Sequence, residues 1–443
     1  MVKVMIIDGG ARGHALALAY LNNADVDSVI VSPGNGGIDK NCLDRDGKFS
    51  SSLCIDSSVS LKDPSSIIKS ARIHKPDLID VAQDDALASG VVDLLKKEGF
   101  RVFGPSRDAA RIEWDKEWSR EFMARHKIAC PEFKAFRIKE EKVKANDYAE
   151  DLLQRKGIIF FKAAGLYAGK GVLPASNKEE IASALAELEK MGPASEVFLI
   201  EEGLPGEEFS YYAIVDGKNF ACFKSSQDNK RVFAGDKGSN TGGMGANAPA
   251  LVTKDLEKQI EEEIIKPAVN GLASEGMPYI GILYLGGIVC SGSIKVIEFN
   301  SRWGDPECHV ILPGIKNSYF ELVNKAIDGK LNEVKIEEDT LSRVCVVGAS
   351  AGYPREYKKG KRIKINYADI PTGVYLLSAG IQAVKENLYT NGGRVFSVVA
   401  DGKNAIDARI RALQGIACCS IEDNGLHYRP DIAWRDVQRL QRE

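Results

Sequence analysis

The sequence lacks the features that would direct a protein out of the cell, into a membrane or onto nucleic acid. None of the apolar runs in its 443 residues approaches the roughly 20 residues needed to span a bilayer. The opening stretch, MVKVMIIDGG, is interrupted too soon to be a signal peptide. A net charge of −3 gives no reason to expect nucleic acid or an anionic membrane as a partner. We therefore expect a cytoplasmic globular protein.

Metal-thiolate and disulfide patterns are missing as well. The five histidines do not cluster, which argues against a zinc site. The nine cysteines are odd in number and form no C-x-x-C pair, as expected where thiols stay reduced. Hydrophobic residues make up 44% and charged residues 27%, which is ordinary for a globular protein. The length predicts about three domains.

Residues 1–106 alternate between strand-like and helix-like segments, which predicts a doubly wound parallel sheet with helices on both faces. The turn after the first strand is not a dinucleotide fingerprint, because Asp8 replaces its first glycine. The second strand ends in Ser32-Pro33-Gly34, without a carboxylate for a ribose. A dehydrogenase is therefore disfavoured, although the turn can still bind phosphate at a helix N-terminus with help from Arg12.

The pattern changes after residue 106 and again near residue 335. Residues 111–128 predict one charged amphipathic helix, and residues 279–300 predict two strands joined by a turn. Residues 226–249 show no regular pattern and predict a long functional loop. We therefore expect an α+β central domain over 107–334, with a subdomain at about 118–200, and a small β-rich domain over 335–443.

The segment KAAGLYAGKGV, residues 162–172, combines two lysines with three glycines. Glycines allow several backbone N–H groups to point at one ligand, and lysines add positive charge, so the segment is suited to bind phosphate. The segment does not match G-x-x-x-x-G-K-[ST], because its first glycine spacing is too short and Gly171 stands where a hydroxyl is needed. It is either a phosphate loop of another kind or a plain glycine-rich turn.

The segment IEFNSRWGDPE, residues 297–307, places Glu298 and Asn300 two residues apart on one face of a predicted strand. A carboxylate and an amide oxygen are hard ligands suited to Mg²⁺ carrying nucleotide phosphates. Arg302 follows on that face or just past it. The same pattern also fits a strand edge with polar side chains.

The segment IEEGLPGEEF, residues 200–209, is an apolar strand that ends in two acids, crosses a Gly-Pro turn and meets two more acids. A hinge between two sheets would offer backbone groups to an adenine edge, and a following carboxylate would take ribose hydroxyls. A surface hairpin turn with solvated acids is the alternative.

Together these segments resemble the ATP-grasp layout, in which two α+β subdomains close on Mg-ATP. The signals in order are lysines placed on strands (Lys116 and Lys162), a glycine loop that would act as a lid, an acidic hinge and a terminal E-x-N strand. A loop of this kind stays open until a ligand orders it.

The resemblance extends to one family over nearly the whole chain. NTGGMGA followed by EFNSRWGDPE is highly specific, and it is accompanied by GGARGHALA, SSQDNKR, AGYPREYKKG, TNGGRVFSVVADG and GLHYRPDIAWR. These segments are similar to those of the phosphoribosylamine–glycine ligase family. The resemblance implies ATP-dependent joining of glycine to 5-phosphoribosylamine through glycyl phosphate, with Mg²⁺ or Mn²⁺, by an enzyme expected to be a monomer.

The resemblance also implies roles for individual residues. Glu298 and Asn300 would hold the metal, Arg302 would steady glycine's carboxylate and the moving phosphoryl group, and Asp228 would receive glycine's ammonium. The implied nucleotide ligands are Lys116, Lys162, Gly169, Lys170, Gly171, Glu201, Glu202, Leu204 and Glu208. The implied substrate-binding residues are Gly10, Arg12, Gly13, Asp84, Asn240, Gly242, Gly243, Met244, Gly245, Asp305, Pro306 and Glu307.

Three departures from the family pattern fall near the phosphoribosylamine side or the rim of the nucleotide site, and they leave the amine substrate less certain than ATP. Ala82-Gln83-Asp84 stands where the family usually has G-P-E, and Glu113-Trp114-Asp115-Lys116 where E-G-S-K is usual. Asp8 and Gly13 replace the common glycine and glutamate. Two alternatives therefore stay open: another ATP-grasp ligase with a different amine, and a nucleotide-binding relative without catalysis.

Overall fold

The computed structural model describes residues 2–38, 52–165, 171–290 and 292–442. The N-terminal part is a five-stranded parallel sheet in the order β3-β2-β1-β4-β5, as predicted. Its strands are β1 (Val2–Asp8), β2 (Val26–Pro33), β3 (Leu53–Ile55), β4 (Leu78–Val81) and β5 (Val102–Phe103). The connecting helices are α1 (Ala11–Leu21), α2 (Pro64–His74), α3 (Asp84–Ala88) and α4 (Val91–Lys97).

Both faces of this sheet are covered because β1 is apolar at successive positions. Val4 and Ile6 pack in the cluster that contains α1, whereas Met5 and Ile7 pack in the cluster that contains α2 and α4. Alternate side chains of a strand point to opposite faces, so a strand buried on both sides reads as a continuous apolar run. The β1 end, where the strand order reverses, is the position at which such sheets bind ligands.

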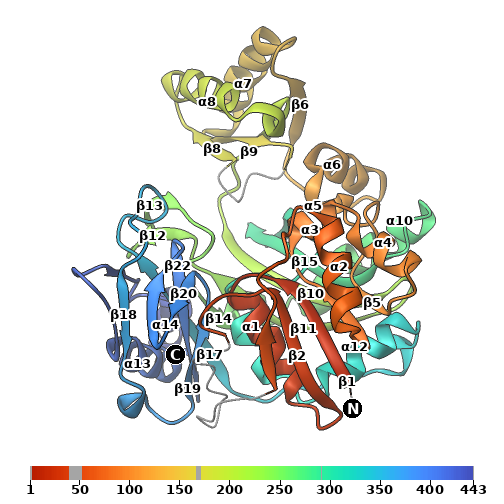
Figure 1. Ribbon diagram of the computed structural model, residues 1–443. Helices are drawn as coiled ribbons and strands as arrows, with labels where there is room; N and C mark the ends of the chain where they lie inside the picture. Colours follow the sequence, from red (N-terminus) through yellow and green to blue (C-terminus); the bar gives the residue numbers. More distant parts are fainter. Residues whose placement is uncertain (1, 39–51, 166–170, 291, 443) are drawn as a thin grey trace.

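A second, antiparallel sheet stands apart from the rest of the molecule at the top of Figure 1. It has the order β6-β9-β7-β8, with β6 (Phe133–Arg137), β7 (Ile159–Ala163), β8 (Val172–Ala175) and β9 (Val197–Glu202). Helices α7 (Lys142–Lys156) and α8 (Lys178–Lys190) share one apolar core with it. We call this unit, residues 133–165 and 171–202, the lid.

The predicted single helix over 111–128 is wrong in detail. It is two helices, α5 (Arg111–Trp114) and α6 (Lys116–Arg125), because Asp115 leaves the helical conformation and its carboxylate caps α6 at the Trp118 N–H. Lys116 therefore begins a helix, and our prediction that it lies on a strand is wrong. Helix α6 packs in the body of the molecule through Trp118 and Phe122, although the predicted subdomain of 118–200 includes it.

The body is built on a nine-stranded sheet with the order β16-β15-β10-β11-β14-β17-β22-β19, to which β24 adds beside β17. Its strands are β10 (Glu207–Asp216), β11 (Phe220–Asp228), β14 (Gly245–Ala248), β15 (Ile280–Cys290), β16 (Ser293–Asn300), β17 (Ser342–Ser350), β19 (Val374–Ser378), β22 (Arg394–Gly402) and β24 (Leu426–His427). One sheet thus runs from the central part of the chain into its C-terminal part.

The prediction that residues 226–249 lack regular structure is wrong. The segment begins in β11, forms a hairpin of β12 (Arg231–Phe233) and β13 (Lys237–Asn240), and ends in β14. Strand β14 pairs with β11 on one side and with β17 on the other. Its partner β17 lies far along the chain, so the local sequence pattern could not predict that β14 is a strand.

The remaining elements cover the sheets. Helix α9 (Glu257–Ile260) continues through a π turn (Glu261–Ile265) into α10 (Lys266–Ser274), and α11 (Cys308–Ile311), α12 (Tyr319–Ile327), α13 (Ala405–Ala417) and α14 (Trp434–Leu440) follow. A small sheet has the order β20-β21-β18-β23, with β18 (Arg362–Ile365), β20 (Ile381–Val384), β21 (Asn387–Thr390) and β23 (Cys419–Ile421). Within the described ranges, no helix is long and apolar enough to cross a membrane.

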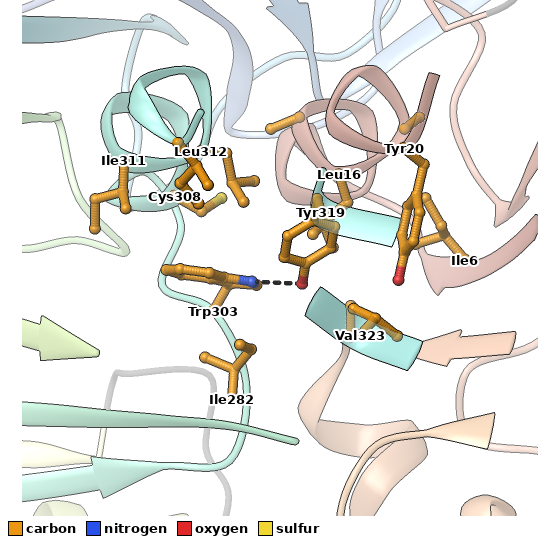
Figure 2. Packing of buried hydrophobic residues seen from close by; sticks show 14 of the residues in the cluster. Ile6, Leu16, Tyr20, Ile282, Trp303, Cys308, Ile311, Leu312, Tyr319 and Val323 are labelled. Atoms are coloured by element: carbon orange, nitrogen blue, oxygen red, sulfur yellow. Dashed lines mark hydrogen bonds between the residues drawn. The ribbon is translucent and has the colours of Figure 1, made fainter. Parts of the chain in front are cut away.

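An aromatic cluster joins the N-terminal sheet to the body (Figure 2). The Trp303 indole N–H donates to Tyr319 Oη at 2.9 Å, and the Tyr319 ring meets Tyr20 of α1 edge-on at 5.0 Å. Tyr20 in turn donates to Asp80 at the end of β4. The turn that follows β16 is therefore anchored in the core, close to the edge where β1 ends.

Candidate functional site

A cavity of about 160 Å³ lies between the lid, helix α6 and strand β16. It brings together eight of the residues singled out from the sequence: Asp84, Lys116, Lys162, Gly171, Glu201, Glu298, Asn300 and Arg302. Glu113 and Arg120 also line it, although the sequence did not suggest a role for either. Gly169 and Lys170 lie outside the described residues.

Two lysines bring positive charge to the cavity from different elements. Lys162 on β7 is buried, and its Nζ lies 2.7 Å from Glu201 Oε2. Lys116, the first residue of α6, approaches the Gly165 carbonyl at 3.4 Å, and burial lowers its pKa. Two ammonium groups facing one cavity suit a polyphosphate ligand. Their contact with ATP stays a prediction.

Glu201 on β9 is the centre of a buried ion cluster that joins the lid to the body. The Arg120 guanidinium donates to both of its oxygens, at 2.7 and 2.9 Å, and also to the carbonyls of Val296 and Ile297 on β16. Burial alone would raise the pKa of Glu201, but Arg120 and Lys162 hold it to about 2. Because this carboxylate is fully engaged, any adenine contact at the hinge would come from backbone groups.

The segment after β9 links two different sheets, so it is not a hairpin turn. It is closely packed: a Cβ on Gly203 would lie 2.3 Å from the Ile158 side chain, and one on Gly206 would lie 2.3 Å from the Val289 carbonyl. Glu202 is buried between the ammonium groups of Lys156 and Lys295. Leu204 is half-buried between the two glycines. The predicted hinge geometry is present, and its role in binding adenine stays a prediction.

Glu298 and Asn300 lie on the same face of β16, as the sequence predicted. The facing residue of Glu298 on β15 is Gly286, where an added Cβ would come within 3.2 Å of the Glu298 side chain. Among the described residues, the Glu298 carboxylate has no hydrogen-bond or ion-pair partner. Burial would raise its pKa, but nearby cations, Lys230 first among them, lower it. An unpartnered, ionised carboxylate beside an amide oxygen fits a Mg²⁺ ion.

Arg302 is held in place by Glu113, a residue that the sequence reasoning missed. The Arg302 guanidinium lies 2.8 Å from Glu113 Oε1, and it donates to Asn300 Oδ1 at 3.2 Å. Glu113 Oε2 accepts from the backbone N–H and hydroxyl of Ser301. Asp84 lines the same cavity near this pair. A buried guanidinium fixed on one side by a carboxylate can present its other face to a second anion.

A smaller cavity adjoins the first and contains Glu208, Asp228 and Lys230. Lys230 Nζ lies 2.8 Å from Glu208 Oε2. Burial and the neighbouring Glu307 carboxylate raise the pKa of Asp228, whose Oδ1 has no hydrogen-bond partner among the described residues. Glu307 accepts from the Tyr284 hydroxyl at 2.8 Å. A cation beside Asp228 would offset both effects and favour the ionised form of this carboxylate.

The glycine-rich loop 240–245 packs against this cavity. Gly243 has φ +112°, and a Cβ there would lie 2.4 Å from Pro306 Cδ and 2.8 Å from Asp228 Oδ1. Arg394 donates to the carbonyls of Gly242, at 2.7 Å, and Asp305, at 2.6 Å, and so ties the loop to the turn after β16. The other predicted residues differ in setting: Met244 and Gly245 are buried, and Asn240 is exposed.

The turn after β1 differs from our expectation of an open phosphate site. The buried Asp8 carboxylate accepts from the N–H groups of Gly10 and Gly13, at 2.6 and 3.1 Å, and from Arg12 Nε at 2.8 Å. A Cβ on Gly13 would come within 2.9 Å of Asp8 Cβ, so the departures at positions 8 and 13 depend on one another. An internal carboxylate therefore occupies donors that a phosphate would use.

A lid sheet joined by a glycine hinge to a body sheet, with lysines from β7 and α6 above an E-x-N strand, defines an ATP-grasp enzyme. Family models agree over almost the whole chain. The N domain of phosphoribosylglycinamide synthetase matches residues 2–113, its ATP-grasp (A) domain matches 114–308, and its C domain matches 343–435. The chain belongs to the phosphoribosylamine–glycine ligase family.

Similar proteins span the full length of the chain. A phosphoribosylamine–glycine ligase of Haemophilus influenzae is 38% identical over 99% of both chains. A homologue of the same name from Chlorobaculum tepidum is 37% identical over 97% of this chain and 99% of its own. The trifunctional purine biosynthetic protein adenosine-3 of Bos taurus is 37% identical over 99% of this chain, which spans only 42% of that longer protein.

Solved structures show the same fold. The phosphoribosylamine–glycine ligase of Thermotoga maritima has a TM-score of 0.77 and 29% identity, covering 97% of this chain and all of the other. A biotin carboxylase domain of 2-oxoglutarate carboxylase from Hydrogenobacter thermophilus, solved with MgADP, ADP and bicarbonate, has a TM-score of 0.70. It is 14% identical and covers 96% of this chain and 91% of its own, so it supports the fold alone.

Proposed function

We propose that this protein joins glycine to 5-phosphoribosylamine at the expense of ATP, giving glycinamide ribonucleotide, ADP and phosphate. The observation that carries the proposal is the convergence of Lys116, Lys162, Glu298, Asn300 and Arg302 on one cavity under the lid. These charged and amide groups could hold a metal-bound triphosphate. Membership of the ligase family then specifies the acid and the amine.

The reaction is two displacements. A carboxylate oxygen of glycine attacks the γ-phosphorus of ATP, the bond to the β–γ bridging oxygen breaks, and glycyl phosphate and ADP form. The amine nitrogen of phosphoribosylamine then attacks the acyl carbon, the carbon–oxygen bond to phosphate breaks, and the amine loses a proton as the amide forms. Such steps need alignment and charge neutralisation more than covalent help.

Residues around the two cavities would supply that alignment. The ammonium groups of Lys116 and Lys162 would meet the phosphates, and Glu208 would accept from the ribose. Glu298 and Asn300 would hold Mg²⁺, or Mn²⁺, which neutralises phosphate charge when bound. Arg302, fixed by Glu113, would face the transferring phosphoryl group. The lid would exclude water from glycyl phosphate, an acyl phosphate that water would otherwise hydrolyse.

The smaller cavity and the β1 edge would hold the other two substrates. Asp228 would receive the ammonium of glycine, and Asp305, Pro306 and Glu307 would line the join with the amine. The phosphate of the amine would lie near Gly10, Arg12, Gly13 and Asp84, beside the loop that contains Asn240, Gly242, Gly243, Met244 and Gly245.

An ADP-release assay tests the reaction as a whole. We expect ADP only when ATP, Mg²⁺, glycine and freshly made phosphoribosylamine are all present, and we would omit one component at a time. Glu298→Gln should abolish metal-dependent turnover while leaving the circular-dichroism spectrum unchanged. The matched control is Glu262→Gln. Glu262 is an exposed ion-pair partner of Lys266 in the π turn before α10, so this variant should keep full activity. A near wild-type rate in Glu298→Gln would contradict the metal assignment.

A ligase with a different amine is the second candidate, and one observation favours it. Asp8 already occupies the N–H groups of Gly10 and Gly13, so the α1 N-terminus offers these donors to a phosphate only if Asp8 moves. ADP release with glycine and a non-phosphorylated amine, at a rate above that with phosphoribosylamine, would support this candidate.

A further inference from the structure

Lys230 lies near three residues of the candidate site, Glu208, Glu298 and Asp228, and the proposed reaction gives it no role so far. It follows strand β11, and its ammonium contacts Glu208 at 2.8 Å. Burial would lower its pKa, but the facing carboxylates of Glu208, Glu298 and Asp228 raise it. These three acids come from β10, β16 and β11. Lys230 is thus a cation between the residues predicted to contact the ribose, the metal and the glycine ammonium.

The backbone of Lys230 is fixed by the glycine-rich loop that follows it. The Lys230 carbonyl accepts from both the N–H and the hydroxyl of Thr241, each at 2.8 Å. The preceding residue, Asn229, exchanges backbone hydrogen bonds with Met244 and Gly245, each at 2.9 Å. The position of Lys230 beside Asp228 is therefore built into the fold, while its four-carbon side chain keeps freedom to choose among anions.

Asp228 and Lys230 are two residues apart in a chain that leaves a strand, and both line the smaller cavity. One offers a carboxylate oxygen without a hydrogen-bond partner among the described residues, and the other offers an ammonium. A free amino acid at neutral pH carries the complementary pair, an ammonium and a carboxylate. The cavity wall also includes Gly286 and Gly287, which add no side chain of their own, and the Phe209 ring packs on Gly287.

We propose that Asp228 and Lys230 together bind the amino-acid substrate as a zwitterion, with Lys230 holding the carboxylate that attacks ATP. This inference rests on the proposed function and adds a residue to it. If ribose hydroxyls bind Glu208 and a metal binds Glu298, two of the three carboxylates that Lys230 faces have other partners. Lys230 then turns to the carboxylate of glycine, and Arg302, already tied to Glu113, is left for the phosphoryl group.

The proposal predicts that loss of the Lys230 ammonium weakens glycine binding and turnover but leaves nucleotide affinity nearly unchanged. In Lys230→Met, KM for glycine should rise at least tenfold and kcat should fall, while the Kd for MgADP, measured by calorimetry, should stay within about threefold of wild type. Lys230→Arg keeps the charge and should recover part of the glycine affinity. Lys266→Met removes a lysine with the same 2.8 Å contact to a glutamate, but on the exposed surface of α10, and should change neither quantity.

The outcomes separate this inference from the proposed function. A wild-type enzyme that never requires glycine for ADP release would overturn both. A wild-type enzyme that requires glycine, with an unchanged glycine KM in Lys230→Met, would overturn this inference alone. So would a loss confined to MgADP affinity, which would make Lys230 a counter-ion for Glu208 only. If Lys230→Met does not fold, a Lys230→Arg enzyme with unchanged glycine KM and kcat would count against a directed contact with the carboxylate.

Discussion

The buried cluster between Arg120 and Glu201 makes a quantitative prediction about how the lid is attached. The Arg120 guanidinium is 4% exposed and the Glu201 carboxylate 2% exposed, and both oxygens of the acid are engaged. Burial would raise the pKa of Glu201, but Arg120 and Lys162 together hold it at about 2 against an ordinary value of 4.5, a difference worth about 3 kcal/mol at 1.4 kcal/mol per pH unit. Removing one partner of such a pair costs about 3–5 kcal/mol because a buried charge is left behind.

A double-mutant cycle measures this energy directly. Arg120→Met and Glu201→Gln should each lower the free energy of unfolding by about 3 kcal/mol or more, whereas the double variant should lose less than the sum. We expect a coupling of at least about 2 kcal/mol from urea unfolding, followed by both circular dichroism and tryptophan fluorescence.

The control is the exposed pair of Arg72 and Glu98, whose closest contact is also 2.7 Å. These side chains are 62% and 37% exposed, so Arg72→Met and Glu98→Gln should couple by less than about 1 kcal/mol. Additive effects of Arg120→Met and Glu201→Gln, or a coupling no larger than that of the surface pair, would refute the assignment of Arg120 as the link between lid and body.

Two further predictions concern the core and the glycine-rich loop. Burial raises the pKa of Asp80 to about 7, although the Tyr20 hydroxyl donates a hydrogen bond to its carboxylate. Between about pH 4 and about pH 7 the folded protein therefore binds this proton and the unfolded chain does not. The free energy of unfolding should fall as pH rises from about 4 to about 7. Asp80→Asn should flatten that fall and stabilise the protein at pH 8 by up to about 4 kcal/mol; melting curves of both proteins that run parallel from pH 5 to 8 would contradict this. Gly243→Ala should reduce kcat/KM at least tenfold, because the new Cβ would lie 2.4 Å from Pro306, whereas Gly99→Ala, with positive φ but nothing within 4 Å, should cost about 1 kcal/mol of stability and leave kcat/KM unchanged. Equal kinetics in the two alanine variants would show that the close approach at Gly243 does not matter.

Much of this site could be predicted because its signals are local. Glu298 and Asn300 share a face since a strand repeats every two residues, and the structure confirms this from the pairing of β16 with β15. The parallel N-terminal sheet followed from the same kind of reasoning, because continuous apolar runs such as residues 2–8 fit strands covered on both sides.

The parts that could not be predicted depend on partners distant in the chain. Arg120 meets Glu201 and the carbonyls of β16, and Glu113 meets Arg302, across separations that no spacing rule covers. The failure at residues 226–249 has the same cause, since β14 is a strand only because β11 and β17 flank it. The contacts of the Asp8 side chain could not be predicted, because a glycine turn before a helix does not show which anion its N–H groups bind. The role of this turn in binding a substrate phosphate stays a prediction.

The uninterrupted body sheet has a consequence for how the polypeptide can be divided. Strand β14 pairs with β11 along one edge and with β17 along the other. A cut in the segment between α12 and β17 would place β14 and β17 on different pieces. Each piece would then expose a strand edge with unpaired N–H and C=O groups. The two pieces would expose matching edges and would be natural candidates for complementation in trans. The A and C family domains therefore share one sheet, although the sequence matches treat them as separate units.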